Sequence, residues 1–159
     1  GAVLITSTCG FLMLLQDEIA RAVRVPVLLS CLTLIPIIRR LTGDRPLGIL
    51  TASARDLGTQ ALARAGCSGL QIDVAAMEQH RIFAETLLPP KSAQLATLDP
   101  MAMSAAVTDV ARKMIAAHPD IAALILAAAL SGRTARVLDP RRTTSHRLTG
   151  GQAPSPADR

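Results

Sequence analysis

The chain alternates between short apolar runs and amphipathic stretches, and this alternation restricts the folds open to it more than any other feature. The apolar runs are rich in Val, Ile, Leu and Ala, as expected of strands that are buried on both faces. They occupy residues 2–7, 27–30, 47–51, 70–74 and 121–126. Because helical segments separate them, the pattern predicts an α/β fold with a doubly wound parallel sheet and flanking helices.

The stretches between these runs carry apolar residues at helical spacing. Helices are predicted over residues 11–23, 31–41, 54–65, 78–88 and 100–117. Pro36 lies inside the second, which should therefore be kinked or begin near Ile35. Ser53 and Asp99 are the expected N-caps of the third and fifth helices, and Gly66 is expected to close the third.

The charge pattern divides the chain into two parts. Residues 1–130 carry 11 Lys or Arg and 10 Asp or Glu, whereas residues 131–159 carry six Arg and two Asp. We therefore expect an α/β domain over 1–130 and an irregular, disordered basic tail over 131–159. The near-neutral domain contains almost no aromatic side chains for base stacking, which argues against a nucleic-acid partner.

Three widely spaced cysteines, at positions 9, 31 and 67, form no CxxC or Cys/His cluster, so no metal site is expected. Unpaired thiols are typical of a reducing compartment, and the predicted location is cytoplasmic. No run of 18 apolar residues occurs, so no membrane span is expected. Cys67 is expected to be structural, and Cys31 to be either a packing residue or part of a pocket.

Small polar residues follow three of the predicted strands. They are Ser7-Thr8-Cys9-Gly10, Ser30-Cys31 and Thr51-Ala52-Ser53, and each group precedes a helix. Ligands of parallel sheets collect at the carboxyl ends of strands, and helix N-termini offer N–H donors to anions. A helix N-terminus also favours the reactive thiolate form of a cysteine, so Cys9 is either a base or nucleophile, or a small buried hydrophobe. No dinucleotide-binding, P-loop or GxSxG motif is present.

The segments ITSTCGFLMLLQDEIARAV, VPVLLSCLTLIPIIRRL and LGILTASARDL resemble the aspartate/glutamate/hydantoin racemase superfamily. The resemblance covers roughly residues 2–126. It implies two flavodoxin-like halves, often in a homodimer, and chemistry without a cofactor or metal on a small carboxylate substrate. It matches Cys9 to the first catalytic cysteine of the family. It also places Ser7, Thr8 and Gly10 around the anion pocket, with Ser30 and Thr51 lining the site.

The sequence departs from the family pattern in two places. The family begins with a further strand–helix portion, so the resemblance implies that this N-terminal portion is missing. Ala128 stands where the second catalytic cysteine is expected, and alanine cannot transfer a proton. Three interpretations stay open: a racemase/isomerase-family enzyme that acts through one cysteine, such as a decarboxylase or cis–trans isomerase, a non-catalytic domain that binds a small anion, and an inactive fragment of such an enzyme.

Overall fold

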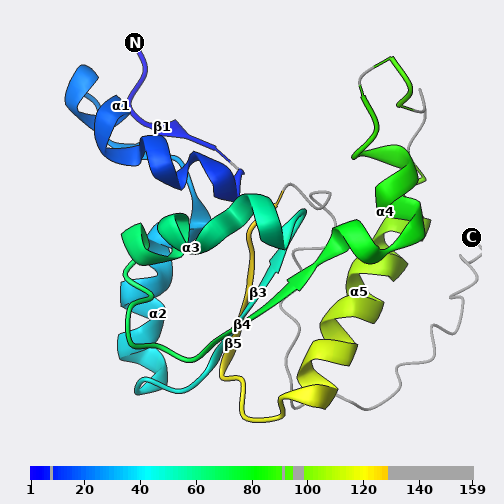
Figure 1. Cartoon of the computed structure of the whole chain (residues 1–159). Coiled ribbons are helices and arrows are strands. Elements are labelled where there is room, and N and C mark those ends of the chain that lie inside the picture. Colours follow the sequence, from blue (N-terminus) through cyan, green and yellow to red (C-terminus); the bar gives the residue numbers. More distant parts are fainter. Residues whose placement is uncertain (8, 91, 95–98, 129–159) are drawn as a thin grey trace, which may run out of the picture.

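The computed structural model describes residues 1–7, 9–90, 92–94 and 99–128, in which five parallel strands form two small sheets with flanking helices (Figure 1). The strands are β1 Ile5–Thr6, β2 Val27–Leu28, β3 Leu47–Thr51, β4 Ile72–Ala76 and β5 Ala123–Leu126. The first two pair with each other, and the other three form a sheet in the order β4-β3-β5. The α/β class with parallel strands is confirmed. The predicted tail over 131–159 lies outside the described residues.

The helical segments carry the capping residues that the sequence predicts. They are the 3₁₀ helices η1 Gly10–Leu15, η2 Cys31–Leu34 and η3 Met77–Gln79, and the α-helices α1 Gln16–Ala22, α2 Ile35–Thr42, α3 Ala54–Arg64, α4 Arg81–Thr86 and α5 Pro100–Ala117. Ser53 caps α3 through a hydrogen bond from the amide of Asp56, and Asp99 caps α5. Pro36 lies in the first turn of α2, where its missing N–H costs nothing, and this fixes the start of that helix.

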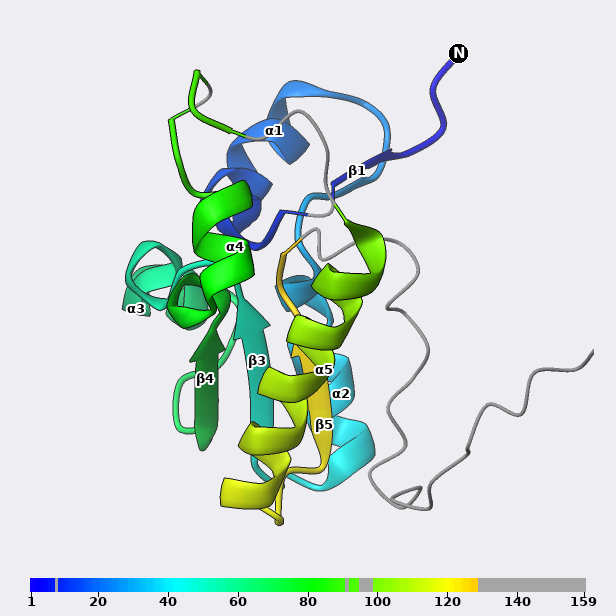
Figure 2. The same ribbon diagram turned by 90° about the vertical axis from the view of Figure 1, so that its right-hand side faces the viewer.

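β3 is the centre of the larger sheet, and all five of its residues are buried. Its side chains alternate between two hydrophobic cores on opposite faces. Leu47 and Ile49 belong to the α3-side core, which includes Leu57, Ala61 and Met13. Leu50 belongs to the α5-side core, formed with Met77, Phe83 and α5. In Figure 2, α5 lies in front of the sheet and α2 lies behind it.

The prediction of one continuous sheet was wrong, because the two short strands do not join the larger sheet. Gln16 supplies the physical reason. On the side of β2 away from β1, the Gln16 side chain donates to the Val27 carbonyl and accepts from the Leu29 amide, both at 2.8 Å. A side chain thus satisfies the backbone groups that would have paired with another strand.

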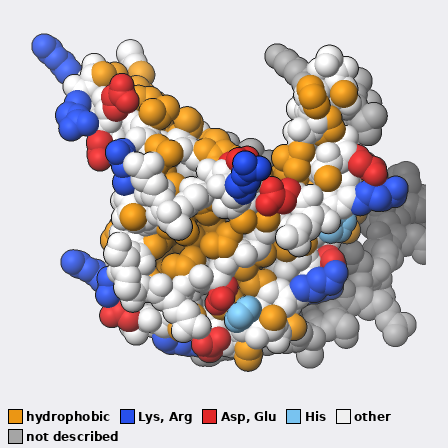
Figure 3. Space-filling model, viewed as in Figure 1, with side chains coloured by type: hydrophobic (Ala, Val, Ile, Leu, Met, Phe, Trp, Pro, Cys, Tyr) orange, Lys and Arg blue, Asp and Glu red, His pale blue; other side chains and the backbone are white. Residues whose placement is uncertain are grey.

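Hydrophobic side chains also reach the surface. Figure 3 shows them across the middle of one face, with charged side chains mainly around its rim. The most exposed large ones in the described residues include Val3, Leu41 and Met101. Exposed apolar patches often mark interfaces, and the homodimer suggested by the resemblance stays a prediction. No described helix has the length and apolar character needed to span a membrane.

Candidate functional site

The connections of the larger sheet create a point at which ligands commonly bind. The chain leaves β3 toward β4 on one side, and later returns to form β5 on the other side of β3. In open parallel sheets, ligands bind beyond the carboxyl ends of the two strands at which the direction of winding reverses. Here these are β3, which ends at Thr51, and β5, which is followed by Ala127 and Ala128.

Gly10 packs directly against this point. Its amide donates to the Ala127 carbonyl at 3.0 Å, although 117 positions separate the two residues. A Cβ atom on residue 10 would lie 2.3 Å from that same carbonyl oxygen and 3.1 Å from the Ala127 Cβ. The close approach requires glycine, and it brings the turn that bears Cys9 to the end of β5.

Ser30 links the two N-terminal turns to each other. Its hydroxyl donates to the Gly10 carbonyl at 3.2 Å and accepts from the Leu32 amide at the start of η2. The side chain is buried, with 1% of its surface exposed. Because a hydroxyl has only one proton to donate, Ser30 acts in this structure as a cap and a tie between the turns, and it has no donor left for a substrate.

Two backbone amides of the Cys9 turn, those of Cys9 and Gly10, are already paired, contrary to the expectation that they would be free to receive an anion. The Cys9 amide donates to the Ser7 hydroxyl at 3.1 Å, and the Gly10 amide donates to Ala127. Cys9 itself is partly buried and occupies the N-cap position of η1 without a side-chain capping bond. Thr8, the remaining residue of the predicted anion pocket, lies outside the described residues.

Cys31 also reaches the end of β5. Its sulfur lies 3.1 Å from the Leu126 carbonyl, to which the thiol donates. Burial raises the pKa of the Cys31 thiol, against the smaller lowering effects of its own amide, the Ser30 hydroxyl and the Leu32 amide. The sequence offered packing and a pocket as alternatives for Cys31, and the structure places it at the same strand end as Gly10. Cys67 lies buried in the α3-side core, as expected for a structural residue.

The raised pKa of Cys31 leads to a test with iodoacetamide. In a variant with Cys9 and Cys67 replaced by alanine, Cys31 should be alkylated more slowly than free cysteine at neutral pH, because less of it is thiolate. Its rate should still be rising with pH above the pKa of free cysteine, about 8.5, where the rate of free cysteine levels off. A matched variant that retains only Cys67, whose pKa burial also raises, is the control. A Cys31 rate that levels off below the free-cysteine value would contradict the assignment.

Thr51 is the one predicted site residue whose polar group is buried and unused. It is 0% exposed, and its Oγ1 has no hydrogen-bond partner in the described part of the chain. Leu50 pairs with Leu126, so Thr51 and Ala127 are neighbours at the next position. Alternation along β3 directs Thr51 to the face of the α3-side core, which also holds Ala127 and therefore the Gly10 contact. A buried hydroxyl without a partner is costly, which makes it a candidate ligand contact.

Ala128 follows directly, but its side chain is turned the other way. Ala127 belongs to the α3-side core, whereas the partly buried Ala128 packs against the α5-side core. The residue that the resemblance aligns with the second family cysteine is thus at the expected strand end. Its side chain packs on the face opposite Ala127 and Gly10.

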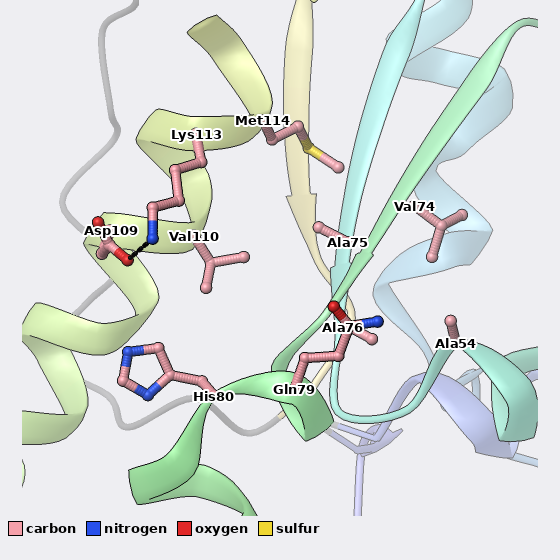
Figure 4. A pocket seen from close by; sticks show the side chains of 10 residues that line it. All are labelled: Ala54, Val74, Ala75, Ala76, Gln79, His80, Asp109, Val110, Lys113 and Met114. Carbon is pink, nitrogen blue, oxygen red and sulfur yellow. Dashed lines mark ion pairs between the residues drawn. The ribbon is translucent and has the colours of Figure 1, made fainter. Parts of the chain in front are cut away.

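A separate hollow of about 450 Å³ lies beside β4, between η3 and α5 (Figure 4). Its polar lining comes from Gln79, His80, Asp109 and Lys113, and it contains none of the predicted site residues. Lys113 pairs with Asp109 at 2.8 Å, and this bond is the main cause of the lowered pKa of Asp109. Because Lys113 is exposed, Asp109 is half-exposed and their charges neutralise each other, this hollow is the weaker candidate. No sequence signal indicated this hollow, since an i,i+4 charge pair is typical of any solvated helix face.

The described residues contain no cluster of three or more His, Cys, Asp or Glu side chains able to hold a metal ion. All three cysteines are free thiols. Comparison with known proteins found no matching family model, curated protein or solved structure.

Proposed function

We propose that this protein is a cofactor-independent isomerase of the aspartate/glutamate/hydantoin racemase type, acting on a small amino acid or a related carboxylate through the Cys9 thiolate. In this proposal β3, β4 and β5 belong to one flavodoxin-like half of a two-half architecture. The order β4-β3-β5, with helices on both faces, is compatible with such a half.

One observation carries the proposal. The turn that bears Cys9, the thiol of Cys31 and the unpartnered hydroxyl of Thr51 converge on the carboxyl ends of β3 and β5. These three segments lie far apart in the sequence, and the convergence falls at the reversal point of the sheet. A thiol can transfer a proton, and a hydroxyl can donate to a carboxylate oxygen.

The chemistry requires no partner beyond the protein side chains and the substrate. A Cys9 thiolate removes the proton on the carbon next to the carboxylate, so that the C–H bond breaks and an S–H bond forms. The electron pair moves into the carboxylate to give an enolate, which a donor such as Thr51 stabilises. Return of a proton to the carbon restores the C–H bond, and in deuterated water the returning atom is deuterium.

Proton exchange gives the direct test. Incubated in deuterated water with D- and L-aspartate and D- and L-glutamate, the protein should replace the α-proton of at least one of them, followed by NMR. Cys9→Ala should reduce the exchange rate by a factor of about 100 or more, the usual contribution of a general base. Cys67→Ala, which removes a buried thiol of the α3-side core, is the matched control and should leave exchange largely intact. Exchange that survives the loss of Cys9 would contradict the proposal.

Binding without chemistry is the second candidate function. It is favoured by Ala128, which cannot transfer a proton at the position the resemblance assigns to the second cysteine. A pure binding domain should show a thermal midpoint that rises with carboxylate concentration, because a ligand bound only to the folded state stabilises it. Such a rise with no α-proton exchange would favour this alternative over the isomerase.

A further inference from the structure

We infer that Cys31 is the second acid–base group of this site, the thiol that delivers a proton to the substrate carbon after Cys9 has removed one. The inference rests on the proposed function and extends it to a residue that the resemblance does not assign. Cys31 would supply the second proton, in place of the residue at position 128.

The first support is the placement of the Cys31 sulfur. It lies 3.1 Å from the Leu126 carbonyl, and the next carbonyl along the chain, that of Ala127, accepts from Gly10. The Cys9 turn and the Cys31 thiol therefore both reach the end of β5, at two successive carbonyls.

The second support is that the two thiol-bearing turns are held in a fixed relation. Ser30, the residue before Cys31, donates to the carbonyl of Gly10, the residue after Cys9. The Ser30 hydroxyl also caps η2, so it positions Cys31 and the Cys9 turn at once. Geometry of this kind matters because a proton-transfer group must be held within hydrogen-bond reach of the reacting atom.

The third support is independent of either thiol and points to a ligand. Thr51 is fully buried, has an unpartnered hydroxyl and lies beside Ala127 on the face that Gly10 contacts. A carboxylate held by this hydroxyl would sit at the strand ends that both turns approach. Position 128 is less suited than Cys31 to supply the second proton, because its side chain packs against the α5-side core.

The protonation state of Cys31 suits its role as a proton donor. Burial keeps the Cys31 thiol protonated at neutral pH, and its proton is held by the Leu126 carbonyl. In the inversion step, the Cys9 thiolate gains the α-proton and the electron pair enters the carboxylate. Cys31 then gives its proton to the opposite face of the carbon, so that a C–H bond forms and Cys31 becomes a thiolate. Proton exchange of both thiols with water, or reversal of the same steps from the other enantiomer, restores the Cys9 thiolate and the Cys31 thiol.

Stereochemistry separates this inference from the proposed function. Starting from L-aspartate or L-glutamate in deuterated water, the wild-type protein should give both deuterium exchange and the D-enantiomer, measured by NMR and chiral chromatography. Cys31→Ala should reduce formation of the D-enantiomer at least tenfold while exchange with retention persists. If Cys31→Ala forms the D-enantiomer at the wild-type rate, the inference is wrong and the proposed function stands. Absence of exchange in the wild type overturns both.

A cross-linking experiment tests the placement without relying on turnover. Dibromobimane becomes strongly fluorescent when both of its bromomethyl groups have alkylated neighbouring thiols. The Cys67→Ala variant, which retains Cys9 and Cys31, should become fluorescent, and L-glutamate should slow the reaction. Variants that also lack Cys9 or Cys31 should stay dark, with circular dichroism used to verify that they are folded. No fluorescence in the Cys67→Ala variant would overturn the inference.

Discussion

Replacing Gly10 with alanine is expected to lower the free energy of unfolding by about 2–4 kcal/mol, the sum of overpacking and a weakened backbone hydrogen bond. The new Cβ would lie 2.3 Å from the Ala127 carbonyl oxygen, which is backbone and cannot rotate away. Relief therefore requires η1 to move off the end of β5, and this movement breaks the 3.0 Å hydrogen bond between the Gly10 amide and Ala127. Urea denaturation followed by circular dichroism measures the change.

Gly48→Ala is the matched control for this prediction. A Cβ at position 48 would meet the Leu124 Cδ1 at 2.7 Å and the Met114 sulfur at 2.8 Å, and both atoms belong to the outer part of a flexible side chain. The protein should lose less stability, and the Cys31 thiol should react with iodoacetamide as in the wild type. Gly10→Ala should accelerate that reaction, because Ser30 anchors Cys31 to the Gly10 carbonyl. Equal losses of stability for the two variants would contradict the contact described at Gly10.

The local elements were predictable because they depend on local chemistry. Ser53 and Asp99 cap the helices that they were expected to cap, and β3 has the bounds that its apolar run indicated. β4 begins two residues later than predicted, since Gly69 adopts a positive φ of 78° and Leu70 closes a turn onto Cys67. A turn of this kind depends on backbone conformation that an apolar run does not reveal.

The division into two sheets was not predictable from strand patterns. It depends on the hydrogen bonds between the Gln16 side chain and the backbone of β2. In the sequence, Gln16 is only one of the polar residues of a predicted helix. The candidate site shows the same limit. The sequence identified the strand ends that bear Cys9, Ser30 and Thr51, but the partners of their polar groups depend on tertiary contacts. Thus Ser30 proved fully paired while Thr51 did not.

Thr51→Val is expected to raise stability and lower ligand affinity together. Valine has nearly the shape of threonine, and it removes a buried hydroxyl that has no partner among the described residues. Eliminating such a desolvated group should increase the free energy of unfolding by about 1–2 kcal/mol. Thr51→Ser is the matched control, since it retains the hydroxyl and loses only a buried methyl group, and should therefore be destabilising.

The effect of a ligand on stability then shows whether the Thr51 hydroxyl binds a ligand or is simply a buried polar group without a partner. If Thr51 donates to a substrate carboxylate, the rise in thermal midpoint produced by L-aspartate or L-glutamate should be much smaller in Thr51→Val than in the wild type, although the unliganded variant melts higher. Thr51→Ser should keep most of that rise from its lower starting point. A Thr51→Val protein that is more stable and binds carboxylate as well as the wild type would show that the hydroxyl serves no ligand. A less stable Thr51→Val protein would instead mean that the hydroxyl has a structural partner. A hydroxyl that is kept unpaired for a ligand lowers the stability of the free protein and raises its affinity for the ligand. Removing that hydroxyl should therefore raise the stability and lower the affinity.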